Sequence, residues 1–329
     1  MKQNNIVANL SPSSILSLLT DQVNWHDKYV LKNWESKTWF GTIAGSVFHD
    51  TVDSWIKSGR TCDIYSVSKE FILDAVHAYK TGKTVLKDKE QYTEDSFKEE
   101  LEVQQNRLIA VFLEYQETIN WEKVVSSEVK FRSRIGTLLG KSPEMVVTGK
   151  VDLDTNDEVY DWKTVKTYDD KEIDYTIQGV IYGLLKAEHT GVMPKQTRFV
   201  EFLRTESYED KLAKWKGDVR LWEDNGSPKG ERPRKPSKPK VEKPLYREVI
   251  IPMDQWRIDV VLEIVQRIQD ALSGVNLFME GRPLPPVSSK YGIPDGWVKF
   301  VENVTGMNPW TGEITDMTSI ADLDISFLD

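Results

Sequence analysis

The sequence of 329 residues is 39% hydrophobic and 29% charged, a composition typical of a folded globular protein with a sizeable core. Its formal charge of −9 excludes a uniformly basic surface, although a local basic groove remains compatible with it. The single cysteine, Cys62, excludes an internal disulfide, a zinc ribbon and a cysteine-ligated iron–sulfur cluster, so any metal must bind to oxygen or imidazole ligands.

The N-terminal part of the chain is predicted to be helical. Serines precede an apolar run that starts a helix near Ser13, and apolar residues recur at helical spacing over 41–57, before Gly59. Residues 66–120 are expected to be helical throughout and to cap one side of a site as a lid-like part. No stretch approaches the roughly 18 apolar residues of a membrane span, and no signal-like segment opens the chain. We therefore expect a cytoplasmic protein without a membrane partner.

Three consecutive strands are predicted after Trp121, where the apolar period changes from helical to alternating. They cover residues 124–132, 146–153 and 158–162. A helix over 173–188, a strand over 198–203, a strand over 246–251 and an amphipathic helix over 253–272 follow. This order predicts a single α/β domain over residues 1–299, with a mixed central sheet flanked by helices and a helical N-terminal part.

Two segments depart from the average composition. Residues 227–244 hold five prolines and seven Lys or Arg against two Glu, which indicates a solvated basic loop. A linker that binds nothing is an equally open interpretation of this loop. Residues 300–329 hold six acidic residues and no Lys, Arg or His, which indicates an acidic C-terminal tail.

The residues that carry chemistry lie on the second and third predicted strands. A turn at 155–157 joins these strands, so Asp152 and Asp161 can converge at the same end of a hairpin. Alternation places Lys163 on the same face as Asp161 and turns Trp162 to the other face. Carboxylates bind Mg²⁺ or Mn²⁺, which polarise a phosphodiester and acidify a bound water, and a lysine can orient that water. An isolated Asp-x-Lys is also typical of a salt bridge between strands.

Four ordered motifs resemble one known family. Gly45-x-x-x-His49, Gly149-x-x-Asp152, Asp161-Trp162-Lys163-Thr164 and Gln178-Gly179-x-x-Tyr182 follow one another along the chain. In this order they resemble the RecB-like branch of the PD-(D/E)XK nucleases, which includes the RecB and AddB nuclease domains, CRISPR-associated nucleases and mitochondrial genome maintenance exonucleases. The resemblance covers about residues 10–272 and implies a restriction-endonuclease-like core.

The resemblance implies a role for each matching residue. The implied metal ligands are His49, Asp152, Asp161 and the backbone carbonyl of Trp162, with Mg²⁺ or Mn²⁺ as the ion. Lys163 would be the catalytic lysine, acting with the two aspartates. Gln178 and Tyr182, four residues apart on one helical face, would contact the DNA backbone or orient Lys163.

Some of these assignments have alternatives. Glu128 matches a less regular acidic position on the first strand. His49 could instead be a core or surface histidine, and Gln178 and Tyr182 could simply pack a buried helix face. Many relatives hold an iron–sulfur cluster on cysteines near the C-terminus, whereas residues 285–291 contain no cysteine. We therefore expect no iron–sulfur cluster.

The implied function is divalent-metal-dependent cleavage of DNA, as an exonuclease on single strands or ends. A structure-selective endonuclease uses the same centre and is one alternative. A catalytically inactive nucleic-acid-binding or scaffold protein of the same fold is the other. The acidic tail resembles those with which single-stranded-DNA-binding proteins recruit partners, so a replication or recombination protein is a second expected partner, and a charged, frayed terminus is the alternative.

Overall fold

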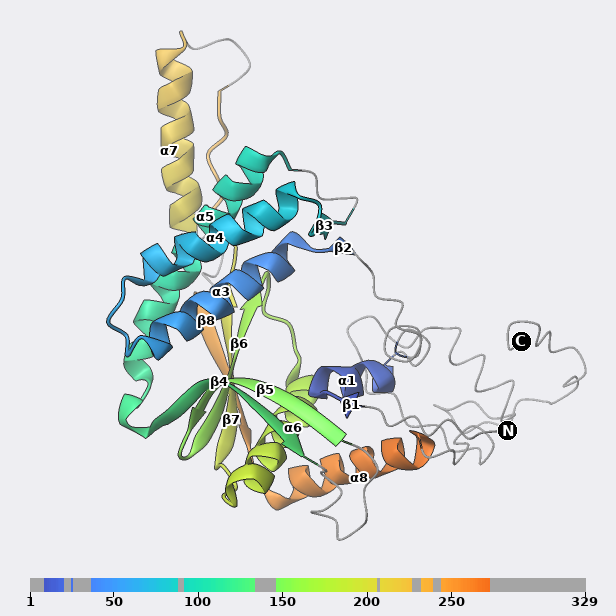
Figure 1. The fold of residues 1–329 in the computed structure, drawn as a ribbon. Coiled ribbons are helices and arrows are strands. Elements are labelled where there is room, and N and C mark those ends of the chain that lie inside the picture. The colour runs from blue at the N-terminus through green and yellow to red at the C-terminus, as the bar shows by residue number, and fades with distance from the viewer. Residues whose placement is uncertain are drawn as a thin grey trace, which may run out of the picture.

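The computed structural model describes residues 9–20, 25, 37–87, 92–133, 146–205, 208–226, 232–238 and 244–272. Within them the chain forms a six-stranded mixed sheet with helices on both faces (Figure 1). The predicted α/β class, a mixed sheet flanked by helices, is therefore confirmed. The acidic tail over 300–329 lies outside the described residues, as do residues 285–291.

The helices and strands follow the predicted order closely. The helices are α1 (Pro12–Thr20), α3 (Phe40–Lys57), α4 (Ile64–Lys80), α5 (Glu94–Tyr115), α6 (Glu172–Thr190), α7 (Tyr208–Asp224) and α8 (Gln255–Leu272). The strands are β1 (Asn9–Leu10), β2 (Lys37–Thr38), β3 (Val85–Leu86), β4 (Val124–Ser133), β5 (Val146–Thr155), β6 (Glu158–Val165), β7 (Gln196–Leu203) and β8 (Tyr246–Pro252). Local sequence signals determine where several helices begin or end. The Asp63 side chain accepts hydrogen bonds from two backbone N–H groups at the start of α4, and Gly191, with a φ of 74°, ends α6.

The sheet combines an antiparallel meander with a parallel crossover. Strands β4, β5 and β6 are antiparallel neighbours, α6 connects β6 to the parallel β7, and β8 adds antiparallel to β7. Strand β4 pairs with β5 from Ser126↔Asp154 to Ser133↔Val147. Strand β6, by contrast, pairs with β5 only at Leu153↔Tyr160 and Asp154↔Val159, next to the hairpin turn. Beyond Asp152 the two strands no longer share a hydrogen-bonded ladder, which leaves room for polar side chains between them.

Two hydrophobic clusters hold the layers together. Helices α1, α6 and α8 pack on one face of the sheet around Val151, Val159 and Ile181. Helices α3 and α5 pack on the other face around Leu153 and Trp162. Figure 1 shows the same three layers, with α3 and α5 on one side of the sheet and α6 and α8 on the other. Because both faces are covered, β5 and β6 each bury apolar side chains on both sides of the sheet.

The expectation that residues 66–120 are helical throughout is wrong over 81–87. Helix α4 ends at Lys80 with Thr81 as its C-cap, and Gly82 has a φ of 71°, a conformation that stops the helix. Val85 and Leu86 then form β3, which pairs in parallel with β2 at Lys37↔Val85. The buried Leu86 side chain packs in a hydrophobic cluster with residues of α3, α4 and α5. This segment is therefore a packed part of the helical layer.

Helix α7 is an addition to the predicted elements. Among its residues whose burial the structure describes, the half-buried ones are Tyr208, Leu212, Trp215, Val219 and Trp222. These positions are three or four apart, the spacing of one helix face, so the signal for this helix was present in the sequence. In the part of the chain that the structure describes, no helix is both long and apolar enough to cross a membrane.

Candidate active site

A close approach of α3 to the sheet positions the histidine. A Cβ atom at Gly45 would lie 2.9 Å from the Oγ1 atom of Thr164 on β6, so a larger residue would push α3 away from the sheet. His49 follows one helical turn later and therefore lies on the same face as Gly45. Its Nδ1 atom lies 2.9 Å from Oδ1 of Asp152 on β5. The small residue and the histidine thus act together to bring a ring nitrogen to a buried carboxylate.

Three carboxylates lie in one row across the meander. The pairs Ser127↔Leu153 and Val129↔Val151 place Glu128 opposite Asp152. On the other side, Asp161 follows Tyr160, whose pair with Leu153 is the last of the β5–β6 ladder, so the same register brings Asp161 next to Asp152 where the two strands are no longer hydrogen-bonded. Residues directly opposite one another on neighbouring antiparallel strands have Cβ atoms about 5 Å apart. Three like charges so close together would repel one another without cations to compensate them.

The strands depart from simple alternation at this row. Val151 belongs to the α6–α8 side of the core and Leu153 to the α3–α5 side, so β5 changes face at Asp152. Opposite it, Glu128 has a φ of 53°, a left-handed conformation that costs a non-glycine residue on the order of 1–2 kcal/mol. The neighbouring Ser127 donates a hydrogen bond to Asp53 of α3. These departures turn Glu128 and Asp152 toward α3 and its histidine.

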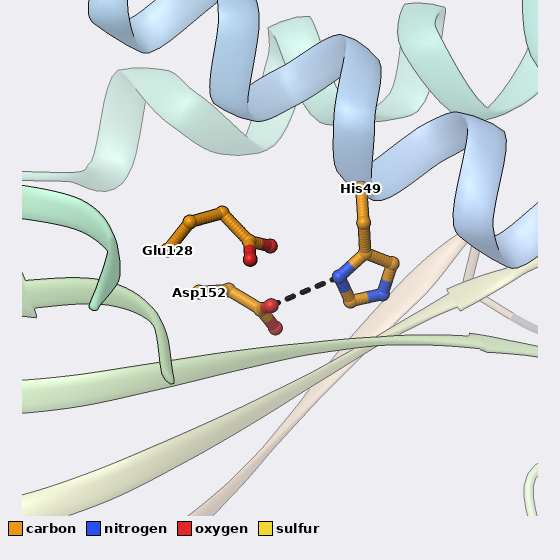
Figure 2. Close-up of side chains that lie close together, drawn as sticks. All are labelled: His49, Glu128 and Asp152. Atoms are coloured by element: carbon orange, nitrogen blue, oxygen red, sulfur yellow. Dashed lines mark hydrogen bonds and ion pairs between the residues drawn. The ribbon is translucent and has the colours of Figure 1, made fainter. Parts of the chain in front are cut away.

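The side chains of His49, Glu128 and Asp152 form one group. Their potential ligand atoms all lie within 4.8 Å of one another (Figure 2). Two carboxylates and one imidazole suit a divalent cation, and this set alone does not fix which one. Lys150, on the same strand as Asp152, forms an ion pair with Glu128 and partly compensates the negative charge. The residues present therefore fit a divalent metal centre.

Asp152 is the central residue of the group. Its Oδ1 faces His49, and its Oδ2 accepts a hydrogen bond from the backbone N–H of Trp162. The residue is only 7% exposed, so both hydrogen bonds are largely shielded from solvent. Burial lowers the pKa of His49, but the carboxylates of Asp152 and Asp161 together raise it further, and the net shift of the pKa is upward.

Asp161 and Lys163 form the second half of the site. The Lys163 ammonium pairs with Oδ2 of Asp161, whose Oδ1 accepts a hydrogen bond of 3.2 Å from the Tyr182 hydroxyl. Gln178 in turn donates to the Tyr182 oxygen at 3.0 Å. Burial raises the pKa of Asp161 and the charge of Asp152 adds to this, while Lys163 opposes it. Burial alone would lower the pKa of Lys163, yet Asp161 raises it overall, which favours the ammonium form.

The structure places the predicted site residues in two adjoining sets. His49, Glu128 and Asp152 form the first, and Asp161, Lys163, Gln178 and Tyr182 form the second. Alternation on β6 is confirmed, since Lys163 lies beside Asp161 and the Trp162 ring is buried on the opposite face. Gln178 and Tyr182 are buried and do not line the adjacent groove, which is compatible both with orienting Lys163 through Asp161 and with packing a buried helix face.

A groove of about 1180 Å³ opens beside these residues. His49, Glu128, Asp152 and Lys163 line its floor, and α3 and α5 form one wall. Five further cationic residues line it: Arg107, Lys150, Lys166, Arg204 and Lys211. Motif spacing did not reveal them, because they come from separate elements that only the tertiary structure brings together. With Lys163 the groove is lined by six Lys or Arg against four carboxylates, those of Asp50, Glu100, Glu128 and Asp152. This excess of positive charge suits a polyanion, although the whole chain is acidic.

A buried lysine fixes the hairpin that carries Asp152 and Asp161. Lys186 of α6 is 3% exposed, and its Nζ lies 2.6 Å from Oδ1 of Asp154. The same ammonium donates to the backbone carbonyls of Thr155 and Glu158, on either side of the hairpin turn. Lys186 therefore ties α6 to the end of the hairpin, and sequence motifs gave no indication of this contact.

Comparison with known proteins gives a family match. A family model described as the PD-(D/E)XK nuclease superfamily matches residues 9–275. The crystal structure of a presumed exonuclease from Eubacterium rectale is similar, with 13% identity, a TM-score of 0.44 and coverage of 83% of this chain and 86% of that chain. A phage-related exonuclease from Haemophilus somnus 129PT has 12% identity, a TM-score of 0.27 and coverage of 74% and 96%. Among curated proteins no match was found.

Proposed function

The chain belongs to the PD-(D/E)XK nuclease superfamily, and on this premise we propose that it is a divalent-metal-dependent deoxyribonuclease. The observation that carries the proposal is the group of His49, Glu128 and Asp152, placed beside Lys163 at the floor of a cationic groove. The order of the four sequence motifs supports assignment to the RecB-like branch. We further propose that the enzyme is an exonuclease acting on single strands or DNA ends.

The proposed roles follow from the contacts of each residue. His49, Glu128 and Asp152 would hold Mg²⁺ or Mn²⁺, and Asp161 and the Trp162 carbonyl remain further proposed ligands. When bound, such an ion polarises the phosphate and makes a bound water more acidic. Lys163 would donate to the phosphate oxygens as negative charge develops there.

The surrounding residues would keep these groups in place. Asp161 accepts the Lys163 ammonium on one oxygen and the Tyr182 hydroxyl on the other, so its carboxylate can hold the lysine in a single orientation. Gln178 fixes the tyrosine by a further hydrogen bond. Cations of the groove, among them Arg204, would bind the phosphates on either side of the reacting one. The chemistry and the binding of substrate thus use different sets of cations.

The alternatives predict different behaviour. An inactive binding protein has no need of an assembled centre, and here two carboxylates, an imidazole and an ammonium lie together. A structure-selective endonuclease would use the same centre. Linear and circular single-stranded DNA distinguish the two active alternatives: an exonuclease degrades the linear strand alone, whereas cleavage of the circle would support the endonuclease.

Replacement of Lys163 tests the catalytic assignment. The purified protein is expected to degrade linear DNA with Mg²⁺ or Mn²⁺ and to stop when EDTA is added. Lys163→Ala should lower the cleavage rate by about 10²- to 10³-fold, the effect of removing one preorganised donor from a developing charge. Lys195→Ala, at an exposed position outside the groove, is the matched control and should cleave at the normal rate. Full activity of Lys163→Ala would refute the assignment.

Replacement of Glu128 tests the composition of the metal centre. Glu128→Gln keeps the size of the side chain but removes one charged ligand, so calorimetric titration should show an affinity for Mn²⁺ lower by roughly 10- to 100-fold. Glu122→Gln, at an exposed position just before β4, should bind Mn²⁺ normally. An unchanged affinity in Glu128→Gln would exclude this carboxylate from the centre and leave Asp161 as the partner of Asp152.

Two expectations from the sequence remain proposals. A replication or recombination protein is the proposed partner of the acidic residues 300–329. Pull-downs with the full chain and with a chain ending at Ala321 would test this proposal. Equal recovery of the partner by both chains would show that the residues after Ala321 do not bind it. A cytoplasmic location also stays a prediction, which localisation of a tagged chain would check; a secreted protein would contradict it.

A further inference from the structure

Between β7 and β8 the chain leaves the sheet and forms a projecting arm. We use "arm" for α7 together with residues 232–238. Phe202 pairs with Tyr246, so the excursion starts and ends at neighbouring points of the sheet. In Figure 1, α7 extends away from the sheet and projects beyond α4 and α5. The arm therefore adds surface without adding to the core.

Specific contacts hold residues 232–238 against α7. The Trp215 indole N–H donates to the carbonyl of Pro233 at 3.0 Å. Arg232 lies over the Trp222 ring and Lys235 over the Trp215 ring, each 5.8 Å from the ring centroid. The segment thus runs back along the helix, from Trp222 toward Trp215. Its backbone is fixed by the helix, so its side chains are presented from a defined path.

The fixed segment presents cations to solvent. Pro233 and Pro236 are half-buried, and the exposed residues include Arg232, Arg234, Lys235 and Lys238. No acidic residue occurs within 232–238. The arm, α7 together with residues 232–238, holds eight Lys and Arg against five Asp and Glu, a net charge of +3, in a chain with a net charge of −9. The excess of positive charge comes from residues 232–238, because α7 itself holds four basic and five acidic residues.

The base of the arm reaches the groove of the active site. Lys211 lies in the first turn of α7 and lines the groove together with Lys163, Lys166 and Arg204. Trp215, which holds the basic segment, follows Lys211 by one helical turn. Cationic side chains thus continue from the catalytic lysine to the arm. A polyanion that is bound in the groove and extends out of it past Lys211 would contact the arm.

We propose that the arm is a second nucleic-acid-binding surface, which holds the phosphate backbone of the DNA outside the catalytic groove. The proposal rests on the nuclease function proposed above, because it assigns both surfaces to the same strand. Helix α7 has 17 residues and is about 25 Å long, the length of roughly seven phosphate spacings along one strand. Continuity with the groove favours nucleic acid over an acidic protein as the occupant.

A charge-neutralised arm tests the proposal. The arm variant carries Arg232→Ser, Arg234→Ser, Lys235→Ser and Lys238→Ser. Binding to a DNA strand of about 40 nucleotides is measured by fluorescence anisotropy in EDTA, so that cleavage does not interfere. We expect the Kd to rise at least about tenfold, and the slope of log K against log salt to fall by about 3, since each of the four lost phosphate contacts on a single strand removes about 0.7 units.

The matched control removes the same charge elsewhere. It carries Lys69→Ser, Lys80→Ser, Lys83→Ser and Lys195→Ser, all at exposed positions outside the arm and the groove. An equal change in both variants, or no change in the arm variant, would overturn the proposal; the second result would leave an acidic protein as the occupant. A further variant with Arg232→Lys and Arg234→Lys keeps the charge and should bind like the natural chain.

A short substrate separates the arm from the catalytic centre. A strand of about six nucleotides fills the groove without reaching along the arm, so the arm variant should degrade it at the normal rate while degrading the long strand more slowly at low substrate concentration. Equal slowing on both substrates would overturn the proposal. Should the natural chain cleave neither strand, the nuclease function fails, while the EDTA binding measurement still decides whether the arm binds DNA.

Discussion

Asp152→Asn is expected to abolish cleavage and to weaken metal binding, because this carboxylate is shared by every part of the centre. One oxygen faces His49 and the other accepts the N–H of Trp162, so an amide must turn an N–H₂ group toward one of them. The change also removes the charge that lies opposite Glu128. Loss of a ligand and loss of orientation together should lower the cleavage rate by about 10³-fold or more.

Folding should survive this change, which makes the result interpretable. The neutral amide at position 152 would no longer repel the carboxylates on the two neighbouring strands, so the midpoint of urea unfolding should stay equal or rise slightly. The control is Asp157→Asn in the turn of the same hairpin, where the carboxylate pairs with Lys123 and Lys195 at the surface. This variant should keep both activity and affinity for Mn²⁺. Cleavage by Asp152→Asn at the normal rate would remove the residue from the centre.

Lys186→Ala is expected to be the most destabilising single change among the residues discussed. The substitution leaves Asp154 buried without its cation, and it also removes the donor to the carbonyls of Thr155 and Glu158. Removing one partner of a buried ion pair costs about 3–5 kcal/mol of unfolding free energy. Urea denaturation followed by circular dichroism should therefore show a clearly lower midpoint.

Two controls separate loss of the pair from loss of charge. Lys195→Ala removes a lysine that is 75% exposed, and its unfolding free energy should change by less than about 0.5 kcal/mol. The double variant Lys186→Met with Asp154→Leu removes both charges and should recover much of the stability, because apolar residues of similar size can replace a buried pair. An unchanged midpoint in Lys186→Ala would show that the pair contributes nothing to stability.

Strong local periodicity made most of the fold predictable. The helical spacing over 41–57 corresponds to α3, and alternation located β4, β5 and β6 in the right order. The interruption of the helical region over 81–87 and helix α7 were not predicted, for different reasons. The first depends on the pairing of β3 with the distant β2, which no local pattern reports. The second carried a helical stripe that is narrow and interrupted by charged residues.

The candidate site was predictable only where the residues concerned lie on a single strand. Alternation along β6 set Asp161 and Lys163 on one face, and the structure agrees. The position of Glu128 needed the register between β4 and β5 and a left-handed backbone at the residue itself. Side-chain period alone would have sent Ser127 and Glu128 to opposite faces. The residue with the least regular motif therefore completes the group with His49 and Asp152.

The α/β class, the hairpin with Asp152 and Asp161, and the superfamily motifs could all be predicted from the sequence, because periodicity and motif spacing are local properties of the chain. The carboxylates that share the space around His49 and the cations that line the groove are brought together by tertiary packing. Those residues come from α3, α5, α7 and three strands, and their distances depend on register, strand twist and helix packing. Contacts of this kind arise from the packing of distant elements, which no single stretch of sequence encodes.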